Sequence, residues 1–242
     1  MRKRAFITGG TKGIGRAVAF TLAEAGYDLL LTFSSDWDAA RSTAEELRQQ
    51  FATDVHLLEA DITDKQSIDK IATYLIKTDL RLDALVFNAG LTCRDTFEAI
   101  QLDEWEKVFF GNVHFPVFLL QRVVNRVNGG GSVVFTGSAM GIYPHAVSLS
   151  YGVTKSAIHA LVQNMIKTLV PYRIRINAIA PGFVDTDWQK TKPAETRHNI
   201  ESKIALGRFC EPEELAEVYK MVIENAYING EVIVVDGGYS YK

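Results

Sequence analysis

Short, almost continuously apolar runs alternate along the chain with longer segments whose apolar residues recur at helical spacing. The short runs are rich in Val, Ile, Leu and Ala, which is typical of strands buried on both faces of a sheet. They predict seven strands, over Ala5–Thr8, Asp28–Phe33, Val55–Ala60, Ala84–Asn88, Ser132–Thr136, Arg173–Ala180 and Val232–Val235.

The longer segments predict helices over Ile14–Ala25, Asp38–Phe51, Ser67–Lys77, Glu104–Val127, Tyr151–Leu169 and Glu213–Asn225. Gly26 is a suitable C-terminal stop for the first, Asp103 could cap the long fourth one, and Pro212 suits the first turn of the last. Strands joined by helical crossovers imply a mostly parallel sheet with helices on both faces. We find no repeat and no linker, so residues 1–242 are expected to form one domain. Such sheets bind ligands at the carboxyl ends of their strands.

The composition excludes several classes of protein. Of 242 residues, 47% are hydrophobic and 23% charged, which argues against a disordered chain. The net charge of −3 gives no reason to expect nucleic acid or an acidic membrane as a partner. No apolar run is long enough to span a bilayer, and glycines interrupt any signal peptide that Arg2 could open. Cys93 and Cys210 suggest no disulfide framework, so a cytoplasmic protein is expected. The five histidines lack metal-ligand spacing, and we expect no metal.

A glycine-rich turn, Thr8 to Gly15, follows the first predicted strand and opens the first predicted helix. Glycines let the backbone approach a phosphate, and the helix N-terminus offers N–H donors. The turn could equally be tight without binding a ligand. It is neither a Walker A motif, which needs Lys-Ser/Thr where Arg16-Ala17 stands, nor the common G-x-G-x-x-G fingerprint.

Tyr151 and Lys155 are four residues apart and therefore share one helix face. The ammonium could lower the phenol pKa and make the tyrosine an acid/base near neutral pH. Tyr-x-x-x-Lys also arises often by chance. Ser138 lies just beyond the fifth predicted strand, at the sheet edge where ligands bind, although most serines in loops have no catalytic role.

Taken together, these residues resemble the short-chain dehydrogenase/reductase family across nearly the whole chain. The family motifs T-G-x-x-x-G-x-G, N-A-G, Y-x-x-x-K and P-G-x-x-x-T stand in order at Thr8–Gly15, Asn88–Gly90, Tyr151–Lys155 and Pro181–Thr186. The resemblance implies a single-domain Rossmann-type α/β fold, a doubly wound seven-stranded parallel sheet with helices on both faces.

The resemblance also implies a catalytic group of Asn112, Ser138, Tyr151 and Lys155. Tyr151 would exchange a proton with the reacting oxygen, and Ser138 would hydrogen-bond that oxygen. Lys155 would hold the cofactor ribose and lower the tyrosine pKa, while Asn112 would support a water next to Lys155. Donors fixed in advance stabilise the charge that develops on the oxygen during hydride transfer.

A nicotinamide cofactor is implied in the same way. Its expected contacts are Gly9, Thr11, Lys12, Gly13, Ile14, Gly15, Ser34, Ser35, Asp61, Ile62, Asn88, Ala89, Gly90, Tyr151, Lys155, Pro181, Gly182, Val184 and Thr186. Phe33 stands where NAD-binding members carry an acidic residue for the ribose 2′-hydroxyl. Ser34, Ser35 and Lys12 could instead bind a 2′-phosphate, so NADP(H) is favoured over NAD(H). Asp36 would weaken this preference if its side chain turned inward.

The closest general resemblance is to 3-oxoacyl-[acyl-carrier-protein] reductases, which predicts an NADPH-dependent carbonyl reductase. The run Asn128–Gly131 lacks the basic residues that often meet the carrier, although Arg122, Arg126 and Arg173 are nearby candidates. The alternatives are a sugar, polyol or steroid-type alcohol dehydrogenase and a catalytically weak NADP-sensing protein.

Substrate specificity is expected from loops over about 139–150 and 183–205. Aromatic residues in these loops suit an apolar or ring-bearing substrate, but core packing would account for them equally well; the residues singled out in the two loops are Tyr143, Pro144, His145, Phe183 and Trp188. His145 is interpreted as a loop residue and not as a catalyst. The family resemblance and the phenylalanines at 109, 110, 115 and 118 predict a homo-oligomer, most simply a homotetramer.

Overall fold

A computed structural model describes residues 2–144 and 148–241 of the chain. Its strands form one seven-stranded sheet in the order β3-β2-β1-β4-β5-β6-β7, and every neighbouring pair is parallel. The strands are β1 Arg4–Ile7, β2 Asp28–Phe33, β3 Val55–Glu59, β4 Leu82–Phe87, β5 Val127–Thr136, β6 Arg175–Pro181 and β7 Val232–Val235. The predicted doubly wound α/β fold is confirmed.

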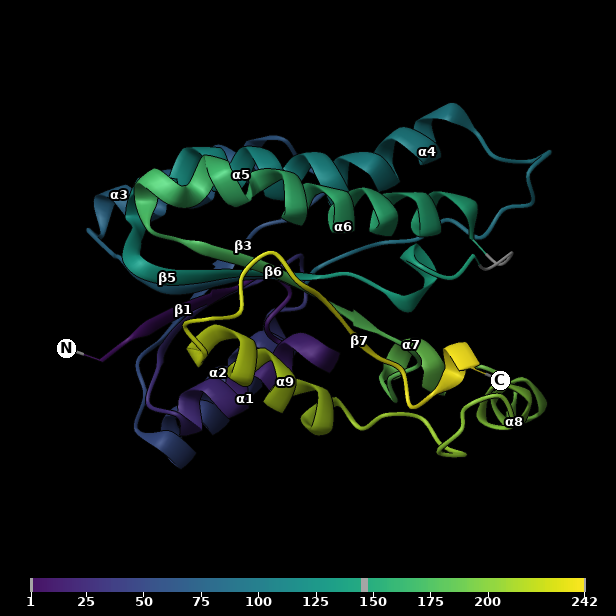
Figure 1. Ribbon diagram of the computed structural model, residues 1–242. Helices are drawn as coiled ribbons and strands as arrows, with labels where there is room; N and C mark the ends of the chain where they lie inside the picture. Colours follow the sequence, from purple (N-terminus) through teal and green to yellow (C-terminus); the bar gives the residue numbers. More distant parts are fainter. Residues whose placement is uncertain (1, 145–147, 242) are drawn as a thin grey trace.

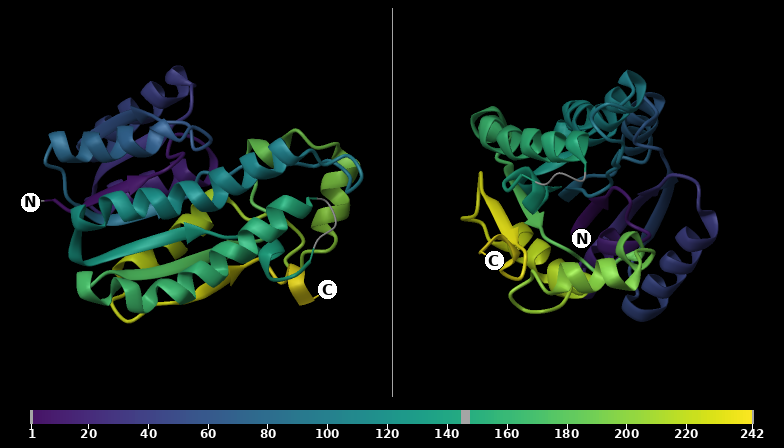
Figure 2. Two further views of the ribbon diagram at one scale, coloured as in Figure 1. Left: turned by 90° about the horizontal axis from the view of Figure 1, so that it is seen from above. Right: turned by 90° about the vertical axis from the view of Figure 1, so that its right-hand side faces the viewer.

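Helices cover both faces of this sheet. In Figure 1, α3, α4, α5 and α6 lie above the strands, and α1, α2 and α9 lie below them. The helices are α1 Gly13–Glu24, α2 Trp37–Phe51, α3 Gln66–Lys77, α4 Leu102–Phe109, α5 Phe115–Val123, α6 Leu149–Leu169, α7 Asp187–Lys190, α8 Ala194–Glu201 and α9 Pro212–Glu224. Figure 2 shows α8 and the C-terminus at one end of the molecule and the N-terminus at the other.

Each face of the sheet has its own hydrophobic core. The residues of a strand point alternately to the two faces. In β1, for example, Phe6 packs into the core under α3, α5 and α6, whereas Ile7 packs into the core under α1, α2 and α9. Both side chains are fully buried. This two-sided burial explains why the strand segments read as continuous apolar runs.

The predicted helix over Glu104–Val127 differs from the structure in three ways. It begins at Leu102 with Gln101 as N-cap, so Asp103 is a first-turn residue and not the cap. Its middle, Phe110–His114, is a π-helix between α4 and α5. It ends in a 3-10 turn, Val124–Arg126, and Val127 already belongs to β5.

The glycine run at 129–131 belongs to β5, which the prediction began only at Ser132. Gly130 has a φ of 93° and donates a backbone hydrogen bond to the carbonyl of Arg173. A Cβ at Gly129 would lie 2.5 Å from the Arg173 guanidinium. These close approaches explain why glycines, which break strand patterns in a sequence, occur inside this strand.

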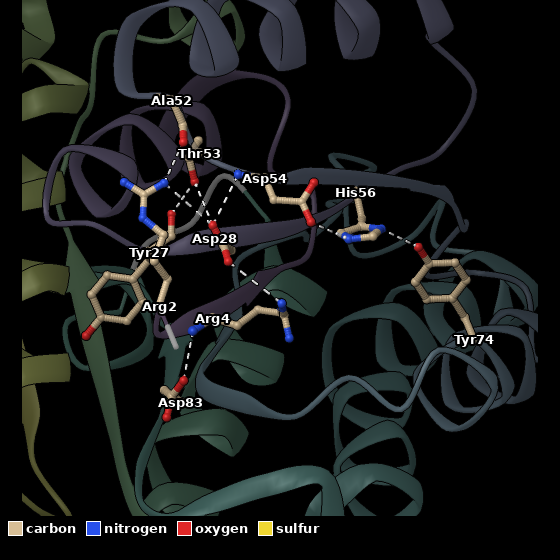
Figure 3. A network of polar contacts seen from close by, with 10 residues as sticks. All are labelled: Arg2, Arg4, Tyr27, Asp28, Ala52, Thr53, Asp54, His56, Tyr74 and Asp83. Carbon is tan, nitrogen blue, oxygen red and sulfur yellow. Dashed lines mark hydrogen bonds and ion pairs between the residues drawn. The ribbon is translucent and has the colours of Figure 1, made fainter.

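Polar contacts tie together the amino ends of β1 to β4, far from the carboxyl ends (Figure 3). The backbone N–H of Arg4 donates to Asp83, and Asp28 accepts from the backbone N–H of Asp54 at 3.1 Å. His56 bridges Asp54 and the Tyr74 hydroxyl. This end of the sheet is thus closed by hydrogen bonds.

In the described part of the chain, no helix has both the length and the apolar character needed to cross a membrane.

Candidate active site

A cavity of about 820 Å³ opens at the carboxyl ends of the strands. Parallel sheets place ligands at this edge because the loops that follow the strands converge there. Its wall includes most of the residues expected to contact a cofactor, namely Gly9, Lys12, Gly13, Ile14, Ser34, Asp61, Ile62, Asn88, Ala89, Gly90, Tyr151, Lys155, Pro181, Gly182, Val184 and Thr186.

Three further residues expected to contact a cofactor do not line the cavity. Thr11 is buried, and its carbonyl accepts a hydrogen bond from the Thr43 hydroxyl at 3.1 Å. Ser35 is exposed before α2. Gly15 lies inside the turn of α1, where a Cβ would be 2.2 Å from the Gly9 carbonyl oxygen. Gly15 and Thr11 therefore support the shape of the glycine turn from behind.

The glycine turn is fastened to the loop after β4. Gly9 and Gly13 have φ values of 62° and 50°, a left-handed conformation that favours glycine. The backbone N–H groups of Asn88 and Ala89 donate to the Thr8 hydroxyl at 2.9 and 3.1 Å. The Asn88 amide in turn donates to the Thr8 carbonyl at 3.1 Å. These bonds hold the turn open as a cradle that a Cβ would obstruct, which fits a phosphate-bearing cofactor.

The end of β2 carries the features that bear on the cofactor ribose. Phe33 is buried, lines the cavity and packs edge-on against Trp37 with 4.7 Å between ring centroids. Asp36 caps α2 by accepting from the Ala39 backbone N–H. Its other carboxylate oxygen binds the ammonium of Lys12, which holds the pKa of Asp36 below its usual value. The Asp36 side chain is 48% exposed and does not line the cavity, so it does not turn inward. It pairs with Lys12 instead, and this ion pair weakens a phosphate-binding role for that lysine.

The predicted catalytic groups Ser138, Tyr151 and Lys155 lie together in the cavity wall. Ser138 follows β5, and Tyr151 and Lys155 project from the first turns of α6. Lys155 is 5% exposed, its ammonium donates to the Thr136 carbonyl at 2.6 Å, and it lies 5.3 Å from the Tyr151 ring centroid. A proton donor and a cation thus face one cavity.

Burial controls the ionisation of this group. It raises the pKa of the Tyr151 phenol, and a hydrogen bond with the Ser138 side chain opposes the rise. Burial also lowers the pKa of Lys155 to about 8. The phenol pKa is thus raised and not lowered as expected, because loss of hydration is the largest cause that acts on it. The phenol keeps its proton at neutral pH.

Asn112 comes from the π-helix and lies beneath the loop after β4. Its amide oxygen accepts from the Leu91 backbone N–H at 2.9 Å, and its nitrogen donates to the Leu91 carbonyl and to the Thr154 hydroxyl. A Cβ on Gly90 would touch both Asn112 and Lys155. Asn112 thus joins three elements next to Lys155. Its predicted water-supporting role stays a prediction.

Sequence reasoning missed His159. This residue is 8% exposed on α6, and its Nε2 accepts from the Ser138 backbone N–H at 3.4 Å. Burial and the charge of Lys155 lower its pKa to about 4. Its position four residues after Lys155 was the available signal, because residues four apart share one helix face.

The aromatic residues of the two predicted substrate loops have different surroundings. Trp188 on α7 lies beside Tyr151, with 6.3 Å between ring centroids, and lines the cavity. Phe183 also lines it but packs with Phe209 and Tyr239 in a small third core. Tyr143 is 38% exposed. His145 lies outside the described residues.

Comparison with known proteins identifies the family of the chain. A family model described as enoyl-(acyl carrier protein) reductase matches residues 9–240. The chain belongs to the short-chain dehydrogenase/reductase family, which this model represents. It is therefore an oxidoreductase that acts on CH–OH or carbonyl groups.

Particular relatives cover the chain almost completely. The 3-oxoacyl-[acyl-carrier-protein] reductase FabG of Aquifex aeolicus (strain VF5) is 32% identical over 240 residues, 98% of this chain and 96% of the relative. The L-rhamnose 1-dehydrogenase (NADP(+)) of Thermoplasma acidophilum is 29% identical over 245 residues, 98% and 95% of the two chains. A short-chain dehydrogenase from Burkholderia cenocepacia J2315, solved in complex with NADP, has a TM-score of 0.92 at 26% identity and 98% coverage of both chains.

Proposed function

We propose that the protein reduces a carbonyl to an alcohol with NADPH, using Tyr151 as the proton donor. The observation that carries the proposal is the placement of Ser138, Tyr151 and Lys155 in the wall of the same cavity as the glycine turn. A bound nicotinamide cofactor supplies the hydride at such a site. The protein must then supply a proton and stabilise the charge on the oxygen.

The side chains divide these tasks. The phenol of Tyr151, which burial keeps protonated at neutral pH, is suited to donate its proton to the substrate oxygen. Ser138, whose side chain is hydrogen-bonded to that phenol, is placed to hydrogen-bond the substrate oxygen as well. The buried ammonium of Lys155 stabilises the phenolate that forms, because opposite charges attract strongly where water is excluded.

NADP(H) is the favoured cofactor in this proposal. Phe33 presents no carboxylate that would repel a 2′-phosphate, and Ser34 and Lys12 line the same part of the cavity. The NADP-bound Burkholderia structure and the NADP(+)-dependent relative support the preference. Asp36 opposes it, because its carboxylate already pairs with Lys12.

A 3-oxoacyl thioester is the proposed substrate, supported by the Aquifex relative. Docking of an acyl-carrier protein has weaker support, because Arg122 and Arg126 form ion pairs with Asp69 and Asp79. The Thermoplasma relative favours a second candidate, oxidation of a sugar. Loops over about 139–150 and 183–205 would discriminate between the two substrates. In the second loop, the Trp188 ring already lies beside the Tyr151 ring.

Assembly into a homotetramer completes the proposal. Of the four phenylalanines considered for contacts, Phe115 is buried in the core and Phe118 is 48% exposed on α5. β7 is an edge strand of the sheet, and Val234 on it is 37% exposed. Light scattering at micromolar concentration tests the assembly, and a monomer would contradict it.

The test of function follows absorbance at 340 nm. Reduction of acetoacetyl thioesters and simple ketones is assayed with NADPH and with NADH. Oxidation of L-rhamnose and other alcohols is assayed with NADP⁺. We expect NADPH-dependent thioester reduction that Tyr151→Phe abolishes while NADPH binding stays nearly intact. Activity with sugars alone would replace the substrate but keep the mechanism. Tight NADPH binding without turnover of any substrate would favour a cofactor-sensing protein.

A further inference from the structure

The cavity holds more positive than negative charge. Two of its cations are already engaged, Lys12 by Asp36 and Lys155 by the Thr136 carbonyl. Three others line the wall without an acidic partner among the described residues: Arg94, Lys192 and Lys203. The acidic side chains of the wall are Asp61 and Asp187. The Asp61 carboxylate accepts two hydrogen bonds from Thr63.

Arg94 and Lys192 are close enough to affect each other. Lys192 is half-buried, and its pKa is lowered first by burial and then by the charge of Arg94. Two like charges brought together in a partly desolvated place destabilise each other, and an anion between them removes that cost. Arginine and lysine are also the donors that carboxylates and phosphates bind best.

Both cations are attached to elements that border Tyr151. Lys192 follows α7, four residues after Trp188, whose ring lies 6.3 Å from that of Tyr151. Arg94 lies in the loop after β4, where the Thr92 hydroxyl binds the Ser148 hydroxyl at 2.7 Å. Ser148 also donates to the Cys93 carbonyl and directly precedes α6. The two cations thus come from two different segments of the cavity wall, each next to an element that carries or contacts Tyr151.

We propose that Arg94 and Lys192 bind an anionic group of the substrate, a carboxylate or a phosphate ester, while the reacting carbonyl lies at Tyr151. This proposal rests on the proposed reductase function and narrows its substrate class to anionic carbonyl compounds. A phosphate ester would come from a thioester carrier arm such as that of coenzyme A. A carboxylate would belong to an oxo acid.

Matched substrate pairs separate the two sources. Acetoacetyl-coenzyme A is compared with acetoacetyl-N-acetylcysteamine, a neutral thioester with the same reacting carbonyl. The anion 4-oxopentanoate is compared with its methyl ester. We expect kcat/KM to favour one charged member by about tenfold or more, mainly through KM, and this preference to fall with added salt.

The variants are Arg94→Met and Lys192→Met, with Lys190→Met as the matched control because Lys190 lies on α7 outside the cavity lining. Each cavity variant should reduce the charged-to-neutral preference about tenfold. Lys190→Met should leave it unchanged. The NADPH dissociation constant should change less than about threefold in all three, which separates substrate binding from binding of the cofactor phosphates.

Calorimetry makes the inference testable without turnover. Each charged ligand and its neutral partner are titrated into the Tyr151→Phe protein saturated with NADP⁺, with and without the Arg94→Met and Lys192→Met changes. Charged ligands that bind no better than neutral ones, or variants that weaken both equally, would overturn the inference. Absence of turnover by the unmodified protein, with the binding preference intact, would instead count against the reductase function alone.

Discussion

The backbone N–H of Ser138 donates a hydrogen bond to Nε2 of His159, 3.4 Å away. An imidazole that accepts at Nε2 is neutral and carries its proton on Nδ1. That Nδ1 is buried and has no hydrogen-bond partner among the described residues. The loop that carries Ser138 is thus supported by a histidine that must stay uncharged.

His159 should make the protein acid-sensitive. Its pKa is about 4 in the folded state against 6.5 when unfolded, so the unfolded chain binds more protons between these values. The stabilisation is complete above pH 6.5 and is lost as the pH falls towards 4. We expect about 3 kcal/mol to be lost over this window. Urea unfolding at pH 7.5 and pH 4.5 measures it.

The carboxylates of the protein also titrate in this range. The informative quantity is therefore the difference in the free energy of unfolding between the variant and the unmodified protein. The side chains of His159→Gln and His159→Leu cannot titrate in this range. Each variant should be less stable than the unmodified protein at pH 7.5, and this difference in the free energy of unfolding should be smaller by roughly 2–3 kcal/mol at pH 4.5. A deficit that is the same at both pH values would disprove the assignment.

Asp36→Asn should strengthen NADPH binding. The asparagine amide oxygen can still accept from the Ala39 N–H and cap α2, but it releases Lys12 from its ion pair. We expect NADPH affinity to rise several-fold and NADH affinity to stay constant. Lys12→Met should lower NADPH affinity about tenfold. Cofactor fluorescence titration measures both constants, and equal changes for NADH and NADPH would count against a 2′-phosphate contact.

Removing the Asn112 amide should destabilise the part of the cavity wall next to Lys155. Asn112→Ala leaves the Leu91 N–H and carbonyl and the Thr154 hydroxyl without this partner. We expect a loss of about 2–4 kcal/mol in the free energy of unfolding, together with reduced turnover. Asn164→Ala is the control, because Asn164 is exposed and its amide donates to the Ala160 carbonyl within its own helix. A change of equal size in both variants would contradict this role.

Two glycines should respond to alanine in opposite ways. A Cβ at Gly15 would lie 2.2 Å from the Gly9 carbonyl oxygen, so Gly15→Ala must distort the turn and weaken cofactor binding strongly. Gly152 is helical, and among the residues that the structure describes its Cβ would meet only the Met140 carbonyl, at 3.6 Å. Gly152→Ala should therefore stabilise the protein by about 0.5–1 kcal/mol. Thermal unfolding with and without NADPH separates the two effects.

Much of this architecture could be predicted from local patterns. Strands such as Asp28–Phe33 are mostly apolar because both faces are covered, and β2 has those bounds. The helix predicted over Glu104–Val127 was harder to predict correctly. Helical periodicity does not reveal the π-helix at Phe110–His114, which adds one residue to a turn. The strand start at Val127 was hidden by glycines whose role depends on Arg173, more than forty residues later.

The site was predictable where chemistry is fixed by residue type and order. Ser138, Tyr151 and Lys155 could be singled out from motifs alone. The pKa direction of Tyr151 could not, because it depends on burial that no motif records. The Lys12–Asp36 ion pair was not predicted, because the sequence suggested only that the Asp36 side chain could turn inward. Arg94 and Lys192 carry no motif, and only the fold brings the two cations to one cavity.

The hydrogen bond from the Asn88 backbone N–H to the Thr8 hydroxyl joins positions 80 residues apart in the sequence. It needs β4 to lie beside β1, on the side of β1 opposite to β2. Contacts of such long sequence separation slow folding, because loop closure precedes any stabilising contact. Recovery of the cradle during refolding should therefore lag behind helix formation. Cofactor binding would then report the last cooperative step of assembly and not an early one.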